Sequence, residues 1–338
     1  MRFALSCGLL LGFGSGPALI LAQQPAAQHE DQQLDQQLQV IAQAHHGHLA
    51  LFAHNLKTGQ TASLDPDRPV QTASVIKLGI LLDAAEQVRG GQVSLADKLV
   101  LTRENQVDGS GVLAQLTAPL TLTLGDTLTL MVIQSDNTAT NMAIDRLGLA
   151  HINATLRAAG LKQTWLYKKI GVPSKEPMPA DQPEFGLGKT TAREMASVME
   201  RLAECRLSLD GTAPLAGDGP LCGVMLHMLL NQQTRDLLPR YLEMMDTDDH
   251  GSAIANKTGA LDKVRSDVAL IATKEGPVVI AGFTWDNADE RWNGDNEAEK
   301  TLAKVGQAVV GRWSPNGLDA DAFPWKNPLA ASPITPQH

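Results

Sequence analysis

Ser74 and Lys77 have the chemistry of an activated nucleophile and its base. They belong to Ser74-Val75-Ile76-Lys77, the one Ser-x-x-Lys in the chain, where an apolar stretch with helical spacing begins. Residues three apart are neighbours on a helix, so the lysine amine can approach the serine oxygen. A serine hydroxyl is a poor nucleophile without such a base. The alternative is a serine that caps the helix and a lysine that points into solvent.

Three further tripeptides contain hydroxyl or amine side chains, as Ser74 and Lys77 do. Ser135-Asp136-Asn137 lies between two helical segments, and Lys257-Thr258-Gly259 ends a late strand. Lys57-Thr58-Gly59 repeats the second pattern, but it lies between two short strands, where a glycine turn accounts for it. Each tripeptide alone is weak evidence of function.

Together and in this order, the motifs resemble the signature of the class A β-lactamases and penicillin-binding proteins. The resemblance covers residues 34–312 and selects Lys257 over Lys57, because the family places its Lys-Thr-Gly after the Ser-Asp-Asn loop. It implies that Ser74 attacks a lactam carbonyl after Lys77 helps to deprotonate it. The backbone N–H groups of Ser74 and Ala260 would form the oxyanion hole.

The resemblance also implies roles for the residues around the nucleophile. Ser135 would relay a proton to the leaving nitrogen, and Asn137 would hold the substrate's side-chain amide. Lys257 and Thr258 would bind the substrate carboxylate, and Gly259 would belong to the same substrate-binding strand. Arg265 would reinforce that contact if the strand continues unbroken, because it follows Lys257 by an even number of residues. Otherwise Arg265 is a surface residue on an adjoining strand.

Glu176 is the residue that the resemblance suggests for activating the deacylating water, because Glu176-Pro177 matches the family's Glu-Pro pair. Two features depart from the family pattern: the stretch from Asn137 to Glu176 is longer, and Ala180 stands where an asparagine is expected. Asp181 and Glu184 are competing candidates. A loop of solvated acids is the other interpretation.

The elements that must position these residues predict an α+β fold. A helix over 34–45 precedes a hairpin of strands 48–54 and 60–64, and helical spacing dominates from 74 to 205. Strands return at 253–255, 267–272 and 277–283, followed by a helix over 297–311. The two ends of the chain therefore share an antiparallel sheet, with an inserted all-α subdomain. The predicted division is 34–73 with 250–313 for the α/β subdomain, 74–249 for the helical one, and 314–338 for a tail.

The N-terminus indicates an exported protein, in which a pair of cysteines can form a disulfide. Residues 1–22 have the short positive start, apolar run and small-residue end of a signal peptide, with a transmembrane anchor as the alternative, and 23–33 is typical of a linker. Cys205 and Cys222 are then the remaining cysteines. A disulfide between them would stabilise the fold by about 3 kcal/mol, whereas two buried free thiols are the other possibility.

Composition and charge restrict the partners. The formal charge of −9 argues against nucleic acid or an anionic membrane as a partner. His45-His46-x-His48 has metal-binding side chains, but it falls between a predicted helix and strand, which favours a solvated loop. We expect no metal or other cofactor, and a monomer that acts on a small molecule, either a β-lactam or a peptidoglycan peptide.

Three functions remain open at this point. The first is a periplasmic or secreted serine β-lactamase, and the second is a penicillin-binding D,D-peptidase or esterase with slow deacylation. The third is a non-catalytic protein that binds peptidoglycan or drugs. The intact set of Ser74, Lys77, Ser135 and Lys257 argues against the third.

Overall fold

A computed structural model of the protein describes residues 29–174, 177–209, 215, 217–242 and 252–323. Its largest sheet combines strands from both ends of the chain in the order β1-β3-β2-β11-β10-β9. The strands in that order are β1 (His29–Glu30), β3 (Gln60–Leu64), β2 (His48–Asn55), β11 (Val278–Trp285), β10 (Val264–Ile271) and β9 (Ile254–Leu261). All neighbouring pairs are antiparallel except β1 and β3. The predicted α+β fold is confirmed.

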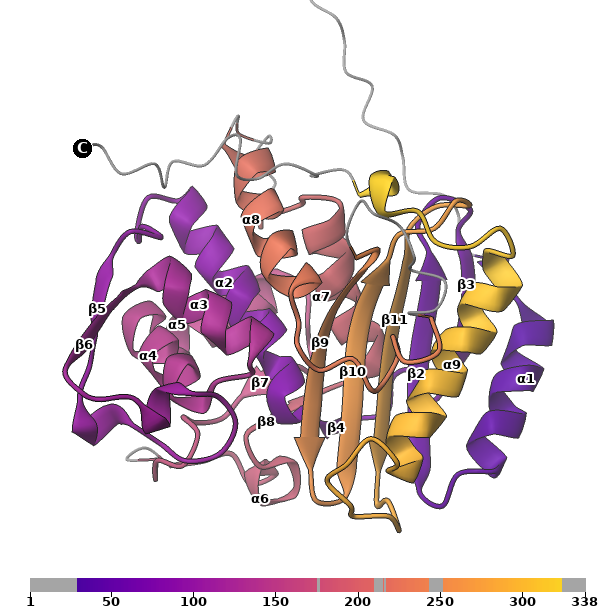
Figure 1. Cartoon of the computed structure of the whole chain (residues 1–338), viewed down its shortest axis with the longest axis horizontal. Coiled ribbons are helices and arrows are strands. Elements are labelled where there is room, and N and C mark those ends of the chain that lie inside the picture. Colours follow the sequence, from indigo (N-terminus) through magenta and orange to yellow (C-terminus); the bar gives the residue numbers. More distant parts are fainter. Residues whose placement is uncertain (1–28, 175–176, 210–214, 216, 243–251, 324–338) are drawn as a thin grey trace, which may run out of the picture.

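Helices cover both faces of this sheet. The helices α1 (Gln32–Gln43) and α9 (Glu297–Trp313) pack together on one face, and α7 (Ala192–Ala203) packs on the other (Figure 1). Neighbouring residues of a strand point to opposite faces. Gly282 therefore faces Leu302 of α9, whereas Phe52, which pairs with Ala281, contacts Arg193 of α7.

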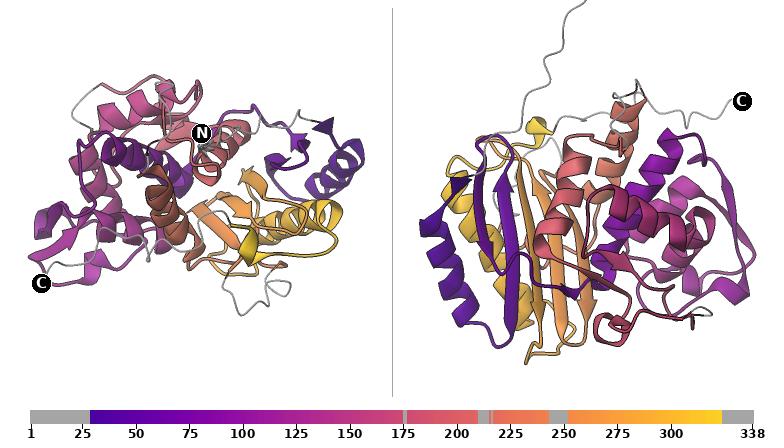
Figure 2. Two further views of the ribbon diagram at one scale, coloured as in Figure 1. Left: turned by 90° about the horizontal axis from the view of Figure 1, so that it is seen from above. Right: turned by 180° about the vertical axis from the view of Figure 1, so that it is seen from behind.

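The middle of the chain forms a mainly helical part beside β9. Figure 1 and the rear view in Figure 2 show these helices together at one end of the sheet. They are α2 (Lys77–Arg89), α3 (Leu124–Ile133), α4 (Asn137–Leu147), α5 (Leu149–Ala158), the short α6 (Gln182–Phe185) and α8 (Asp218–Leu230). Buried apolar side chains run continuously from the sheet into this part.

Two small sheets complete the described architecture. One pairs β5 (Lys98–Leu101) with β6 (Leu120–Thr123), and the other has the order β4-β8-β7. The latter consists of β4 (Val70–Gln71), β8 (Gly188–Thr190) and β7 (Trp165–Leu166). Because β4 ends three residues before Ser74, this sheet determines where the chain enters the site.

The first predicted elements lie close to their expected bounds, with one difference. The hairpin and its glycine turn form as predicted, and Asn55 Oδ1 accepts hydrogen bonds from the backbone N–H groups of Lys57 and Thr58. The end of the stretch interpreted as a linker is ordered instead: β1 pairs with β3, and Asp31 caps α1 at Leu34. The signal peptide predicted at 1–22 lies outside the described residues.

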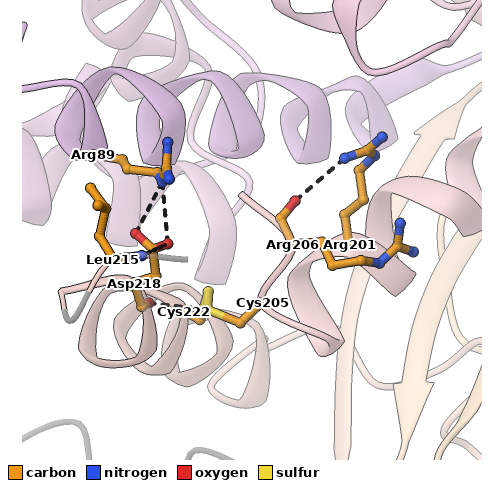
Figure 3. The surroundings of a disulfide bond; sticks show 7 residues. All are labelled: Arg89, Arg201, Cys205, Arg206, Leu215, Asp218 and Cys222. Atoms are coloured by element: carbon orange, nitrogen blue, oxygen red, sulfur yellow. Dashed lines mark hydrogen bonds and ion pairs between the residues drawn. A yellow bond between two sulfur atoms is a disulfide. The ribbon is translucent and has the colours of Figure 1, made fainter. Parts of the chain in front are cut away.

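The disulfide between Cys205 and Cys222 is confirmed. The two sulfur atoms are bonded, and the bridge joins the segment after α7 to α8 (Figure 3). In the same region Arg89 Nε donates to Asp218 Oδ1 over 3.1 Å, linking α2 to α8. The bridge thus ties α8 to the segment after α7, and the ion pair ties α8 to α2, the helix that follows the nucleophile.

Candidate active site

Ser74 lies in a short 3₁₀ helix, Ala73–Ile76, directly before α2. The serine is partly buried, and Thr72 is tied to the small sheet because its N–H donates to the Gly188 carbonyl over 2.9 Å. Ala73 has a φ of 43°, which residues other than glycine rarely adopt. The chain therefore makes one strained 3₁₀ turn at the serine, and α2 begins at Lys77 rather than at Ser74.

Lys77 is completely buried and connects the nucleophile's turn to the Ser135 loop. Its Nζ donates to the Ser135 carbonyl over 2.6 Å, and lies 3.1 Å from Ser135 Oγ and 3.3 Å from Asn137 Oδ1. A protonated amine has three N–H donors, so these acceptors match the charged form of Lys77. The structure thus brings together three of the predicted site residues.

Lys257 reaches the same hydroxyl from the sheet. Its Nζ lies 3.1 Å from Ser135 Oγ and donates to the Thr258 carbonyl over 2.7 Å. Lys257 is completely buried on the face of β9 that also carries Gly259. Two lysine amines from opposite parts of the fold therefore converge on the hydroxyl of Ser135.

Both amines lose their protons more readily than an ordinary lysine. Burial lowers the pKa of Lys77 well below 10.5; the nearby charge of Lys257 lowers it further, and Asp136 opposes the shift. Burial also lowers the pKa of Lys257 to about 7, with Asp267 opposing. An uncharged lysine at neutral pH can act as a general base.

The Ser135 loop is held in a strained conformation by Asp136. Ser135 has a φ of 52°, and Asp136 caps α4 by accepting from the Ala139 N–H over 2.8 Å. The other carboxylate oxygen of Asp136 accepts from Val112 N over 2.7 Å and Leu113 N over 2.8 Å. Strain of this kind persists only where the surroundings enforce it, and here the buried carboxylate enforces it.

The backbone of strand β9 lies very close to the turn that holds the nucleophile. A β-carbon at Gly259 would lie 3.0 Å from the Ser74 nitrogen and 2.9 Å from the Thr72 carbonyl oxygen. Only glycine permits this approach. The segment from Thr258 to Ala260, which was predicted to bind substrate, therefore lies beside the serine.

Arg265 is not brought to this group. Strand β9 ends at Leu261, and Arg265 lies on β10, where it pairs with Ala260 and so faces away from Lys257. Its guanidinium is buried against α9, donating to Glu299 Oε1 over 3.0 Å and to the Arg291 carbonyl over 2.7 Å. The even spacing of Lys257 and Arg265 predicted a shared face only for a continuous strand, and a turn separates the two residues.

Glu176 lies outside the described residues, but its two competitors are visible. Asp181 is held by Lys189, whose Nζ donates to Asp181 Oδ2 over 2.6 Å. Glu184 is exposed, and its carbonyl accepts from Gln71 Nε2 over 2.5 Å. The Asp181 side chain and the Glu184 carbonyl thus attach this loop to β8 and β4, next to the nucleophile's turn.

Two hydroxyls at the site were missed by sequence reasoning. Ser110 Oγ donates to the Ser135 carbonyl over 2.6 Å. Ser266 is buried on the site face of the sheet, and its Oγ donates to the Gly259 carbonyl over 3.2 Å. The signal for Ser110 was its position in Gly109-Ser110-Gly111, while Ser266 becomes visible only once the β9–β10 register is known.

The stretch His45-His46-x-His48, which we interpreted as a solvated loop, contacts neighbouring elements, and His45 is buried. His45 Nε2 lies 2.9 Å from Asn287 Oδ1, His46 Nδ1 lies 3.0 Å from Glu297 Oε1, and His48 stacks on Trp285. These contacts join the turn after α1 to the end of β11 and the start of α9. They explain the histidines as structural residues.

An antiparallel sheet beside a helical part, with these three motifs converging at their junction, is the arrangement of the serine β-lactamase-like hydrolases. The chain belongs to the β-lactamase enzyme family, whose model matches residues 33–313. No curated protein sequence matches it.

Solved structures with similar folds include β-lactamases and a penicillin-binding protein. A β-lactamase from Sphaerobacter thermophilus is 28% identical, with a TM-score of 0.69 over 83% of this chain and 97% of that one. A PBP-A variant in an acyl-enzyme complex with penicillin G is 23% identical, with a TM-score of 0.69 over 85% and 98%. An ancestral class A β-lactamase is 21% identical, with a TM-score of 0.66 over 82% and 99%. The last two similarities concern the fold alone.

Within the described part of the chain, the helices are too short or too polar to span a lipid bilayer.

Proposed function

We propose that this protein is an exported serine β-lactamase that hydrolyses β-lactams through an acyl-enzyme on Ser74. The observation that carries the proposal is the convergence of Lys77 and Lys257 on Ser135 Oγ, each 3.1 Å from it, beside the strained turn that holds Ser74. Lowered lysine pKa values in a buried site are typical of acid–base catalysis.

Acylation begins with a proton transfer. Uncharged Lys77 accepts the proton of Ser74 Oγ, and the oxygen attacks the lactam carbonyl carbon. The N–H groups of Ser74 and Ala260 stabilise the oxyanion, and the close approach of Gly259 to the Ser74 nitrogen supports this pairing. As the carbon–nitrogen bond breaks, the proton passes from Lys77 through Ser135 to the leaving nitrogen.

The remaining site residues bind the substrate and complete turnover. Lys257 and Thr258 bind its carboxylate, and Asn137 binds its side-chain amide. Asn137 is oriented for this role because its Nδ2 donates to the Asp108 carbonyl over 3.2 Å. A water molecule then cleaves the ester on Ser74, with Glu176 as the proposed base.

We expect kcat/KM for a penicillin to fall as the pH rises through about 7, because the pKa of Lys257 is lowered to about 7. The amine is charged below that value and attracts the substrate carboxylate; above it, the amine is neutral and the attraction is lost. The measurement is kcat/KM against pH, compared with the methyl ester of the same penicillin, which lacks the charge. Lys257→Met should abolish the alkaline limb.

Lys57→Met is the matched control, since Lys57 belongs to the other Lys-Thr-Gly and is exposed at a hairpin turn. It should leave the profile unchanged. An ester with the same alkaline limb as the acid would show that Lys257 does not bind the carboxylate.

A second candidate function is a penicillin-binding D,D-peptidase or esterase that deacylates slowly. The observation that favours it is the exposed Ala180, where the family resemblance expects an asparagine that holds the water. The two functions share the acylation step and differ only in how fast water then cleaves the acyl-enzyme.

Hydrolysis of a chromogenic cephalosporin distinguishes these functions. Repeated turnover is the result expected of a β-lactamase. A stoichiometric burst with a stable adduct after it would reject that activity in favour of the peptidase, and the absence of both would favour a non-catalytic binding protein.

A further inference from the structure

Ser110 contacts the Ser135 loop but has no role in the mechanism above. Its hydroxyl donates to the Ser135 carbonyl over 2.6 Å and lies 3.3 Å from Asn137 Oδ1. Its own carbonyl accepts from the Asn137 N–H over 3.0 Å. Ser110 is thus attached to the two residues that hold Lys77.

The flanking glycines show that this contact is built into the fold. Gly109 and Gly111 have φ values of 111° and 101°. A β-carbon at Gly109 would lie 2.4 Å from Asn137 Nδ2, and one at Gly111 would lie 2.2 Å from Asp136 Oδ2. Side chains at either position would push the segment away from the loop, so glycine on both sides allows Ser110 to reach it.

When Lys77 loses a proton, its amine has fewer hydrogens than there are acceptors around it. The amine contacts three acceptors: the Ser135 carbonyl, Ser135 Oγ and Asn137 Oδ1. An ammonium group has a hydrogen for each, whereas a neutral amine has two hydrogens and a lone pair. Ser110 Oγ already donates to one of these acceptors, the Ser135 carbonyl, so that carbonyl keeps a hydrogen-bond donor when the neutral amine no longer donates to it.

We propose that Ser110 is a positioning residue that supports the uncharged form of Lys77 by donating to the Ser135 carbonyl, the acceptor that the neutral amine can release. The inference rests on the proposed function of Lys77 as the base for Ser74. Besides Ser110, the amine is influenced by the charges of Lys257 from β9 and Asp136 from the start of α4. Neither charge is altered by a change at Ser110, so the hydroxyl can be tested by itself.

The test is the pH dependence of acylation by a fluorescent penicillin, measured on the full chain. Ser110→Ala removes a donor that favours the neutral amine, so the acidic limb should move to higher pH by about half to one unit. The rate on the alkaline side of that limb should change much less. Ser110→Thr retains the hydroxyl and should restore the original limb. Thr117→Ala, at an exposed residue further along the same segment, is the control.

A uniform loss of rate without a shift of the limb would show a merely structural role and overturn the inference, as would an unchanged profile. Thermal unfolding of each variant establishes that it folds. NMR titration of the Lys77 side-chain methylene next to the amine measures the same shift without any substrate. If the unsubstituted protein is not acylated, the proposed function fails, but this titration still decides the role of Ser110.

Discussion

Replacing Lys77 by methionine should slow the acylation of Ser74 by about 10³-fold, because a positioned general base contributes about 10²–10⁴ to the rate. Methionine has a similar length and no charge to bury, so the completely buried site can accommodate it. The measurement is the rate of adduct formation with a penicillin, monitored by intact mass at several pH values. The variant should also lose the acidic limb that the amine imposes on the unsubstituted protein.

Lys98→Met is the control for this experiment, since Lys98 is an exposed lysine on β5. Acylation of Lys77→Met at the original rate would show that another group deprotonates the serine. The contacts between Lys77 and the Ser135 loop would then serve only to hold the loop in place.

Replacing Glu176 by alanine should leave acylation largely intact and slow deacylation by about 10²–10⁴-fold. The reason is that water is a weak nucleophile towards an ester unless a base removes its proton. The measurement is the lifetime of the penicillin adduct, compared with the steady-state rate. We expect the adduct to accumulate in this variant.

The two neighbouring acids provide the controls for Glu176. Asp181→Asn breaks the ion pair with Lys189, and Glu184→Gln changes an exposed residue. Neither should trap the adduct as strongly as Glu176→Ala. Unchanged turnover in Glu176→Ala, with a trapped adduct in one of the others, would transfer the role to that acid.

Local patterns in the sequence predicted the elements that have clear periodicity. The hairpin from His48 to Leu64 and the helix that begins at Glu297 have alternating or helical spacing, and the structure places them within a few residues of the prediction. The motifs predicted which side chains meet, because Lys77, Ser135 and Lys257 do converge. Helix α8 was not predicted, since its apolar residues are distributed around the helix rather than along one stripe.

Features that depend on register and on distant contacts could not be predicted. The side of the sheet on which Arg265 lies depends on the turn between β9 and β10. This turn consists of Asp262 and Lys263. Ser110 reaches the Ser135 loop across 25 residues of sequence, and the sequence does not show which distant segment it contacts. Only the two glycines around Ser110 hinted at a close approach.

The proposed function depends on the acylation of Ser74 by β-lactams. Its most direct test is to incubate the protein with penicillin, stop the reaction at short times, and locate the mass increase by peptide mapping. We predict an adduct on the peptide that contains Ser74, and neither adduct nor hydrolysis in Ser74→Ala. An adduct on another residue, or penicillin hydrolysis at the original rate by Ser74→Ala, would contradict the proposed mechanism.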